Sequence, residues 1–150
     1  MSLTKEIERL REIEADRDDR YVARFENVLA SIAGLNDPNC IVALTEFFDD
    51  DAKFDELMFS IIHTIEIQDD KTYCRELLKA APKLCSRSPR WASIVFMRVL
   101  NSDSTRTQLV LQLRNAPGPT KEAMRNLMVK INERGVEFMA KTTPVIVAAN

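Results

Sequence analysis

Residues 54–65 read FDELMFSIIHTI, and this stretch determines the fold class of the 150-residue chain. Its apolar side chains recur at spacings of three and four, at Phe54, Leu57, Met58, Ile61, Ile62 and Ile65. That spacing predicts an α-helix with an apolar stripe along one side. Because the stripe is broad, we expect other elements to pack against it from two sides, which places this helix at the centre of the core.

The same periodicity extends outward in both directions and predicts helices throughout the chain. We expect further helices over about 3–13, 21–32, 38–48, 70–84, 89–100, 103–113 and 119–131. Asp37-Pro38 and Ser88-Pro89 are typical helix starts, because a side-chain acceptor precedes a proline whose φ is already helical. Gly34 is the expected end of the second helix, and Pro82 is expected to bend or end the fifth.

The predicted fold class is therefore all-α. Helix pairs repeat about every 33 to 37 residues, and their short connections make neighbouring helices antiparallel. This spacing favours a right-handed, HEAT-like stack of antiparallel helical pairs. A compact α-helical bundle is the alternative, since no repeated side-chain pattern accompanies the period. We expect residues 1–150 to form a single helical domain, with 142–150 as an unassigned tail.

Charge is divided unevenly between the two halves of the chain. Residues 1–70 hold 18 Asp and Glu against 7 Lys and Arg, a formal charge of −11, whereas residues 71–150 hold 5 against 14, a charge of +9. Folding does not require such a separation. A large surface of one sign is suited to attracting and orienting an oppositely charged macromolecule, so we expect a binding function.

Composition limits the class of protein further. Cys40, Cys74 and Cys85 are odd in number and form no C-x-x-C pair, so we expect packing residues in a reducing compartment rather than disulfides. The N-terminal stretch lacks the apolar segment of a signal peptide, and no window approaches the roughly 20 apolar residues that span a bilayer. We expect a soluble, cytoplasmic protein without membrane contact.

The sequence offers little for catalysis, metals or cofactors. His63 and Glu66 share a helix face, but a zinc site needs three or four ligands, so we expect no metal site. The chain contains no phosphate-binding glycine motif and no nucleophile elbow. We therefore expect no catalytic residues, no cofactor and no enzymatic activity.

A basic run supports a weaker alternative, nucleic-acid binding. Its members are spaced near the helical repeat and could neutralise phosphates: Arg75, Lys79, Lys83, Arg87 and Arg90. The acidic half of the same small protein would oppose the approach of a nucleic acid. We therefore expect a protein partner, with a HEAT-like adaptor or nucleic-acid-binding scaffold as the alternative function.

Acidic residues gather around two predicted turns. The first acidic group is Glu46, Asp49, Asp50, Asp51, Asp55 and Glu56, and the second is Glu66, Asp69 and Asp70. The two groups should lie at opposite ends of the helix over 54–65, about 20 Å apart. Together they form the candidate binding site for a basic protein. Reversal of Asp50, Asp51 and Asp55 to lysine should slow association with that partner.

Two stretches carry a family resemblance, ELMFSIIHTIE at 56–66 and SPRWASIVFMRVLNS at 88–102. They resemble the Immunity protein 30 family over about residues 20–130. That family is known from polymorphic-toxin and contact-dependent growth-inhibition loci. The resemblance implies a non-enzymatic cytoplasmic antitoxin that binds a cognate toxin domain delivered by a neighbouring bacterium. We expect that toxin to be basic and a nuclease. The resemblance does not identify contact residues, and it leaves Trp91 as a core residue.

Overall fold

The computed structural model describes residues 2–150, and within that range the chain forms nine α-helices, one short 3-10 helix and no strand. The elements are α1 (Leu3–Ala15), α2 (Tyr21–Leu35), α3 (Cys40–Thr45), α4 (Asp55–Ile65), α5 (Asp70–Arg87), α6 (Pro89–Leu100), α7 (Asp103–Leu113), α8 (Gly118–Asn132), η1 (Val136–Phe138) and α9 (Met139–Ala148). The predicted all-helical class is confirmed.

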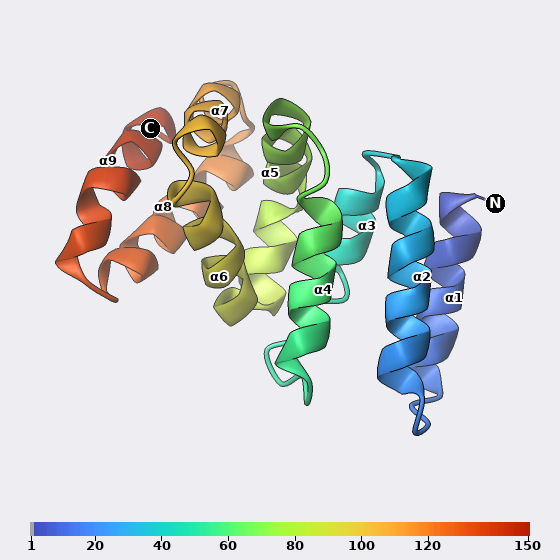
Figure 1. The fold of residues 1–150 in the computed structure, drawn as a ribbon. Coiled ribbons are helices and arrows are strands. Elements are labelled where there is room, and N and C mark those ends of the chain that lie inside the picture. Colours follow the sequence, from blue (N-terminus) through green and yellow to red (C-terminus); the bar gives the residue numbers. More distant parts are fainter. Residues whose placement is uncertain (1) are drawn as a thin grey trace.

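The helices follow one another across the molecule from α1 at one end to α9 at the other (Figure 1). Helix α2 packs against α1 and α4, α5 contacts α3, α6, α7 and α8, and α9 contacts α7 and α8. Side-chain contacts also join α4 to α6. The arrangement fits a helical bundle, and the right-handed, HEAT-like stack stays a prediction.

Helix α4 is central, as its apolar stripe predicts. Leu57, Met58, Ile61, Ile62 and Ile65 are all buried in the core. The side chain of Trp91, at the start of α6, is also fully buried. The expectation that Trp91 is a core residue is therefore confirmed.

Two helices extend beyond an end that the sequence suggested. Helix α2 continues past Gly34 and ends at Leu35. Asn36 caps it with a left-handed φ of 49°, a conformation that asparagine tolerates better than most residues. Helix α5 runs through Pro82 to Arg87. Proline removes one backbone hydrogen bond, but α5 packs against four other helices and buries Leu78 and Ala81 beside it. Tertiary packing offsets the local cost.

Two other segments differ from their predicted extents. Helix α3 begins at Cys40 rather than at Pro38, because residues 38 and 39 form a turn in which the Asp37 carboxylate accepts the amide of Asn39 at 3.0 Å. Most of the unassigned tail belongs to α9, which buries Thr142 and Val145 against the preceding helices.

The three cysteines are free thiols; Cys40 and Cys74 are buried and Cys85 is half-buried. Burial raises the pKa of Cys40 to about 11 and that of Cys74 to about 12, with a smaller contribution in each case from a nearby aspartate. Both side chains are therefore protonated at neutral pH and act as small apolar core residues.

Candidate interaction surface

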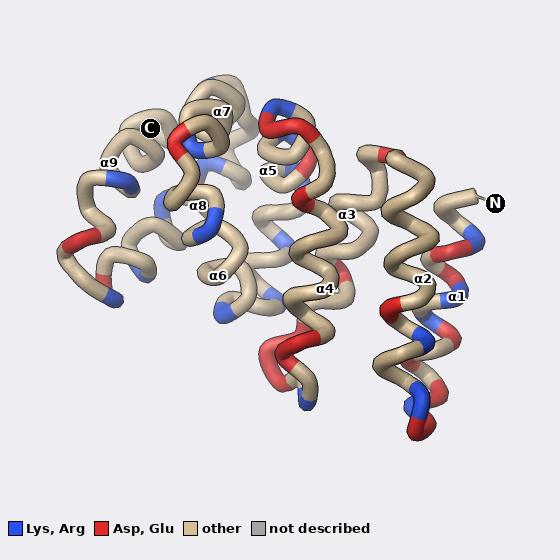
Figure 2. The backbone as a smooth tube through the Cα atoms, viewed as in Figure 1, with Lys and Arg blue, Asp and Glu red and all other residues tan. Residues whose placement is uncertain are grey.

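The two acidic groups lie at opposite ends of α4, as predicted from the sequence. Figure 2 shows acidic residues in the loop that precedes α4 and again where α4 is followed by α5. The distribution of charge is nevertheless more mixed than the two halves of the sequence indicate. Acidic and basic residues alternate along α1, and two ion pairs join acidic residues at the two ends of α4 to arginines of α6.

Asp50 is a structural residue. Its carboxylate accepts the backbone amides of Arg90 at 3.0 Å and Trp91 at 3.1 Å, which are two of the first N–H groups of α6. The helix has no internal partner for these groups, so Asp50 caps α6 from the preceding part of the chain. Ser88 holds the cap position expected from the sequence, but its hydroxyl donates to the carbonyl of Phe48 at 2.8 Å instead.

Other members of the first acidic group also have partners within the chain. Asp55 pairs with the Arg90 guanidinium at 3.1 Å, and Asp49 accepts the amide of Asp51 at 2.9 Å. Glu46 makes a longer ion pair, 3.9 Å, with Arg11 of α1. These contacts organise the loop, which folds back onto the start of α6.

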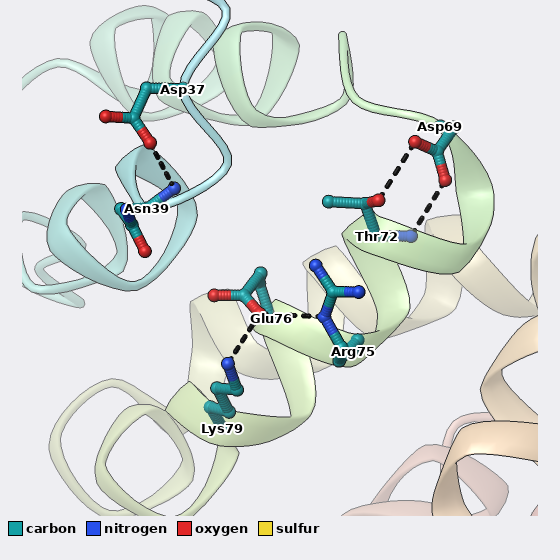
Figure 3. A network of polar contacts seen from close by, with 7 residues as sticks. All are labelled: Asp37, Asn39, Asp69, Thr72, Arg75, Glu76 and Lys79. Atoms are coloured by element: carbon teal, nitrogen blue, oxygen red, sulfur yellow. Dashed lines mark hydrogen bonds and ion pairs between the residues drawn. The ribbon is translucent and has the colours of Figure 1, made fainter.

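The second acidic group is engaged in the same way. Glu66 receives two hydrogen bonds from Arg98, at 2.8 and 2.9 Å, and Asp70 accepts the hydroxyl of Thr105 at 2.9 Å. Asp69 caps α5 by accepting the Thr72 amide and hydroxyl, both at 2.9 Å (Figure 3). The amide bond, and then the hydroxyl bond, lower the pKa of Asp69.

Within residues 2–150, two of the predicted binding residues have carboxylates that make no hydrogen bond or ion pair. Asp51 and Glu56 are exposed, and neither side chain makes a hydrogen bond or ion pair with another residue in the range 2–150. They flank the start of α4. A charge reversal that includes Asp50 and Asp55 would disturb folding as well as binding, so the cleaner positions are Asp51 and Glu56.

A groove that the sequence analysis missed lies beside the first acidic group. It has a volume of about 480 Å³ and lies between the α1–α2 turn and the loop that leads into α4. Its apolar lining is half-buried or buried and comprises Val22, Phe47, Ala52, Phe54, Leu57 and Met58. The charged residues around it are Glu14, Asp18, Asp19 and Asp49, with Arg17 and Lys53.

Part of this charge is neutralised within the chain. Glu14 accepts hydrogen bonds from Arg17, at 2.7 Å, and from the Tyr21 hydroxyl, while Asp18 pairs with Arg24 at 3.1 Å. Burial, and then the bond to Glu14, raise the pKa of Tyr21, so its hydroxyl stays protonated. Residues 17–19 belong to the turn between α1 and α2, and they line one side of the groove. Their place in the groove depends on the packing of α2 against α4.

Part of the basic run is paired within the chain. In residues 2–150, no three His, Cys, Asp or Glu side chains are grouped closely enough to hold a metal ion. Within the basic run, Arg75 and Lys79 pair with Glu76, and Arg90 pairs with Asp55. These three cations are already partly neutralised by carboxylates. No helix in this range combines the length and apolar character needed to cross a bilayer.

The cap formed by Asp50 leads to a stability prediction. Asp50→Ala leaves two helix amides without an acceptor, so the free energy of unfolding should fall by about 1–2 kcal/mol. Urea unfolding followed by circular dichroism measures it. Asp51→Ala is the matched control, because the neighbouring carboxylate has no partner, and it should change stability by less than about 0.5 kcal/mol. Equal effects of the two substitutions would contradict the cap.

Comparison with known families identifies the class of protein. A family model for immunity proteins, described as Immunity protein 30, matches residues 12–109. The chain belongs to the Immunity protein 30 family. Neither the curated proteins nor the solved structures include a match. The matched range begins and ends earlier than the expected 20–130, and it contains both acidic groups and every residue that lines the groove.

Proposed function

We propose that this protein is an antitoxin that binds and neutralises a cognate toxin domain delivered by a neighbouring bacterium. The single observation that carries the proposal is membership of the immunity family over residues 12–109, which supports an immunity role. We propose further that the protein acts in the cytoplasm by binding alone, without catalysis. The toxin is expected to be a basic nuclease.

The candidate binding surface is the first acidic group, at the N-terminal end of α4. Asp51 and Glu56 present charge that no contact within residues 2–150 neutralises. Such charge attracts a basic partner over a distance set by the Debye length, about 8 Å at physiological salt. The other carboxylates of the first acidic group, which organise the loop before α4, lie near these two residues and contribute to the same negative field.

Binding and neutralisation can be tested with one defined partner. An immunity gene is expected to lie directly downstream of the gene for a large secreted toxin. The probe is the purified C-terminal domain of that secreted protein, called here the upstream domain. The two proteins should copurify as a stable complex, and coexpression should restore growth of cells that produce the upstream domain. If there is no complex and no protection, the proposal is wrong. Retention of nucleic acid on purification would instead favour the scaffold alternative.

The acidic surface leads to a kinetic prediction. The double substitution Asp51→Lys and Glu56→Lys should slow association with the upstream domain about tenfold at low salt, because steering charge is reversed. The dependence of the association rate on salt should weaken as well. Stopped-flow fluorescence at several salt concentrations measures both quantities.

A matched control separates local from general charge effects. Glu122→Lys with Glu133→Lys makes the same charge change on exposed residues at α8, which lies away from α4 on the C-terminal side of the molecule (Figure 1). This control should slow association much less than the variant near α4. If both variants slowed association equally, the overall charge of the protein would explain the effect, and the surface near α4 would be excluded as the binding site.

A further inference from the structure

We infer that the groove beside α4 binds a basic segment of the toxin, an inference that rests on the proposed immunity function. The segment would place an apolar side chain, or the aliphatic stem of a lysine or arginine, on the groove's apolar lining. Its cationic group would meet the carboxylates at the rim. The inference follows from three features of the groove: its lining, its uncompensated charge and the position of Lys53.

The lining resembles the centre of a protein interface. Val22, Phe47 and Phe54 are only half-buried, and they line the groove together with the buried side chains of Leu57 and Met58. Burial of such surface by a partner is favourable, and binding energy in interfaces is concentrated where an apolar or aromatic side chain fills a pocket. A volume of about 480 Å³ is enough to take side chains from a short segment.

The charge at the rim selects a basic occupant. Glu14 and Asp18 have arginine partners within the chain, but Asp19 makes no side-chain hydrogen bond or ion pair with any residue from 2 to 150. Among the residues that the structure describes, only the Asp51 amide donates a hydrogen bond to the Asp49 carboxylate. Four carboxylates and two cations line the groove, so it keeps an excess of negative charge.

Lys53 shows how the groove can hold a cation. Its ammonium group lies over the ring of Phe54, 5.4 Å from the ring centre, and both residues line the groove. Aromatic faces attract cations at this distance. A basic side chain from a toxin would compete with Lys53 for this position and would be repelled by it. Lys53 is therefore expected to weaken binding, which is opposite to the effect of the carboxylates.

Two charge substitutions test the inference with opposite signs. For the upstream domain, Asp19→Lys should raise the Kd about tenfold, and Lys53→Gln should lower it about fivefold. Lys71→Gln on α5 is the control for removal of one exposed positive charge and should change the Kd much less. Isothermal titration calorimetry measures all four proteins, including the unmodified chain.

A steric substitution tests the groove without changing charge. Ala52→Trp places a large ring in the groove and should raise the Kd about thirtyfold, whereas Ala140→Trp on exposed α9 should leave it unchanged. Circular dichroism melting reports whether each variant folds. If Ala52→Trp is unfolded, the two charge substitutions decide the outcome.

The outcomes distinguish the groove from the wider proposal. Weaker binding by the Asp19→Lys variant, together with tighter binding by the Lys53→Gln variant, supports the groove as the binding site. If the unmodified chain binds the upstream domain and the Kd is unchanged in both charge variants, the groove is wrong and the immunity function stands. If the unmodified chain neither binds nor protects, the immunity function fails and the groove assignment fails with it.

Discussion

Trp91→Ala is expected to lower the free energy of unfolding by about 3–5 kcal/mol, because it removes the largest fully buried side chain in the core. The indole ring stacks on Phe48 with ring centres 6.1 Å apart, and it lies nearly perpendicular to the Phe59 ring with centres 5.2 Å apart. Phe48 belongs to the loop before α4, and Phe59 belongs to α4 itself. One ring thus joins α6 to both elements that form the candidate surface.

Urea unfolding followed by far-ultraviolet circular dichroism measures this loss without relying on the fluorescence of Trp91, the only tryptophan. Trp91→Phe is the conservative control. It keeps an aromatic ring and removes an indole N–H that is buried without a hydrogen-bond partner in the described chain, so it should cost clearly less than alanine. A loss below about 1 kcal/mol for Trp91→Ala would show that the ring does not join these elements.

The sequence predicts the helices well where one local pattern dominates. The apolar stripe of α4 and the Ser88-Pro89 start of α6 each depend on residues a few positions apart, and both features are present. The predicted helix ends differ from the structure where nearby residues alone do not decide where a helix ends. Gly34 and Asn36 can both end a helix, and Pro82 remains helical because distant helices pack around α5.

The candidate site was predictable only in part, for the same reason. The position of the acidic groups at the two ends of α4 follows from helix length alone. The role of Asp50 does not, because its acceptor atoms meet amides 40 and 41 residues later in the chain. The groove likewise joins residues 14–22 to residues 47–58, and no pattern within either segment reveals that contact.

The paired substitution of Arg75 and Lys79 by methionine is expected to destabilise the protein by about 3 kcal/mol at pH 7, because it leaves the buried Glu76 carboxylate unpaired. Glu76 on α5 accepts hydrogen bonds from Lys79 at 2.7 Å and Arg75 at 3.1 Å (Figure 3). Burial alone would raise the pKa of Glu76, but these two bonds outweigh it and hold the pKa below its usual value of 4.5.

The pH dependence should change sign at this one residue. In the unmodified protein, Glu76 stabilises the fold above its unfolded pKa, and that contribution is lost as the pH falls through the lowered folded pKa. Without the two cations, burial raises the folded pKa above the unfolded value. The carboxyl then favours folding only when protonated, so the penalty should shrink as the pH falls from 7 toward 5.

Urea unfolding at pH 7 and pH 5 measures the difference in stability between the variant and the unmodified protein. Lys71→Met with Lys83→Met is the matched control, since it removes the same charge from exposed positions of the same helix. This control should show a small difference that does not depend on pH. If the Arg75 and Lys79 variant also showed an equal loss at both pH values, its cost would come from lost side-chain packing rather than from an unpaired buried carboxylate.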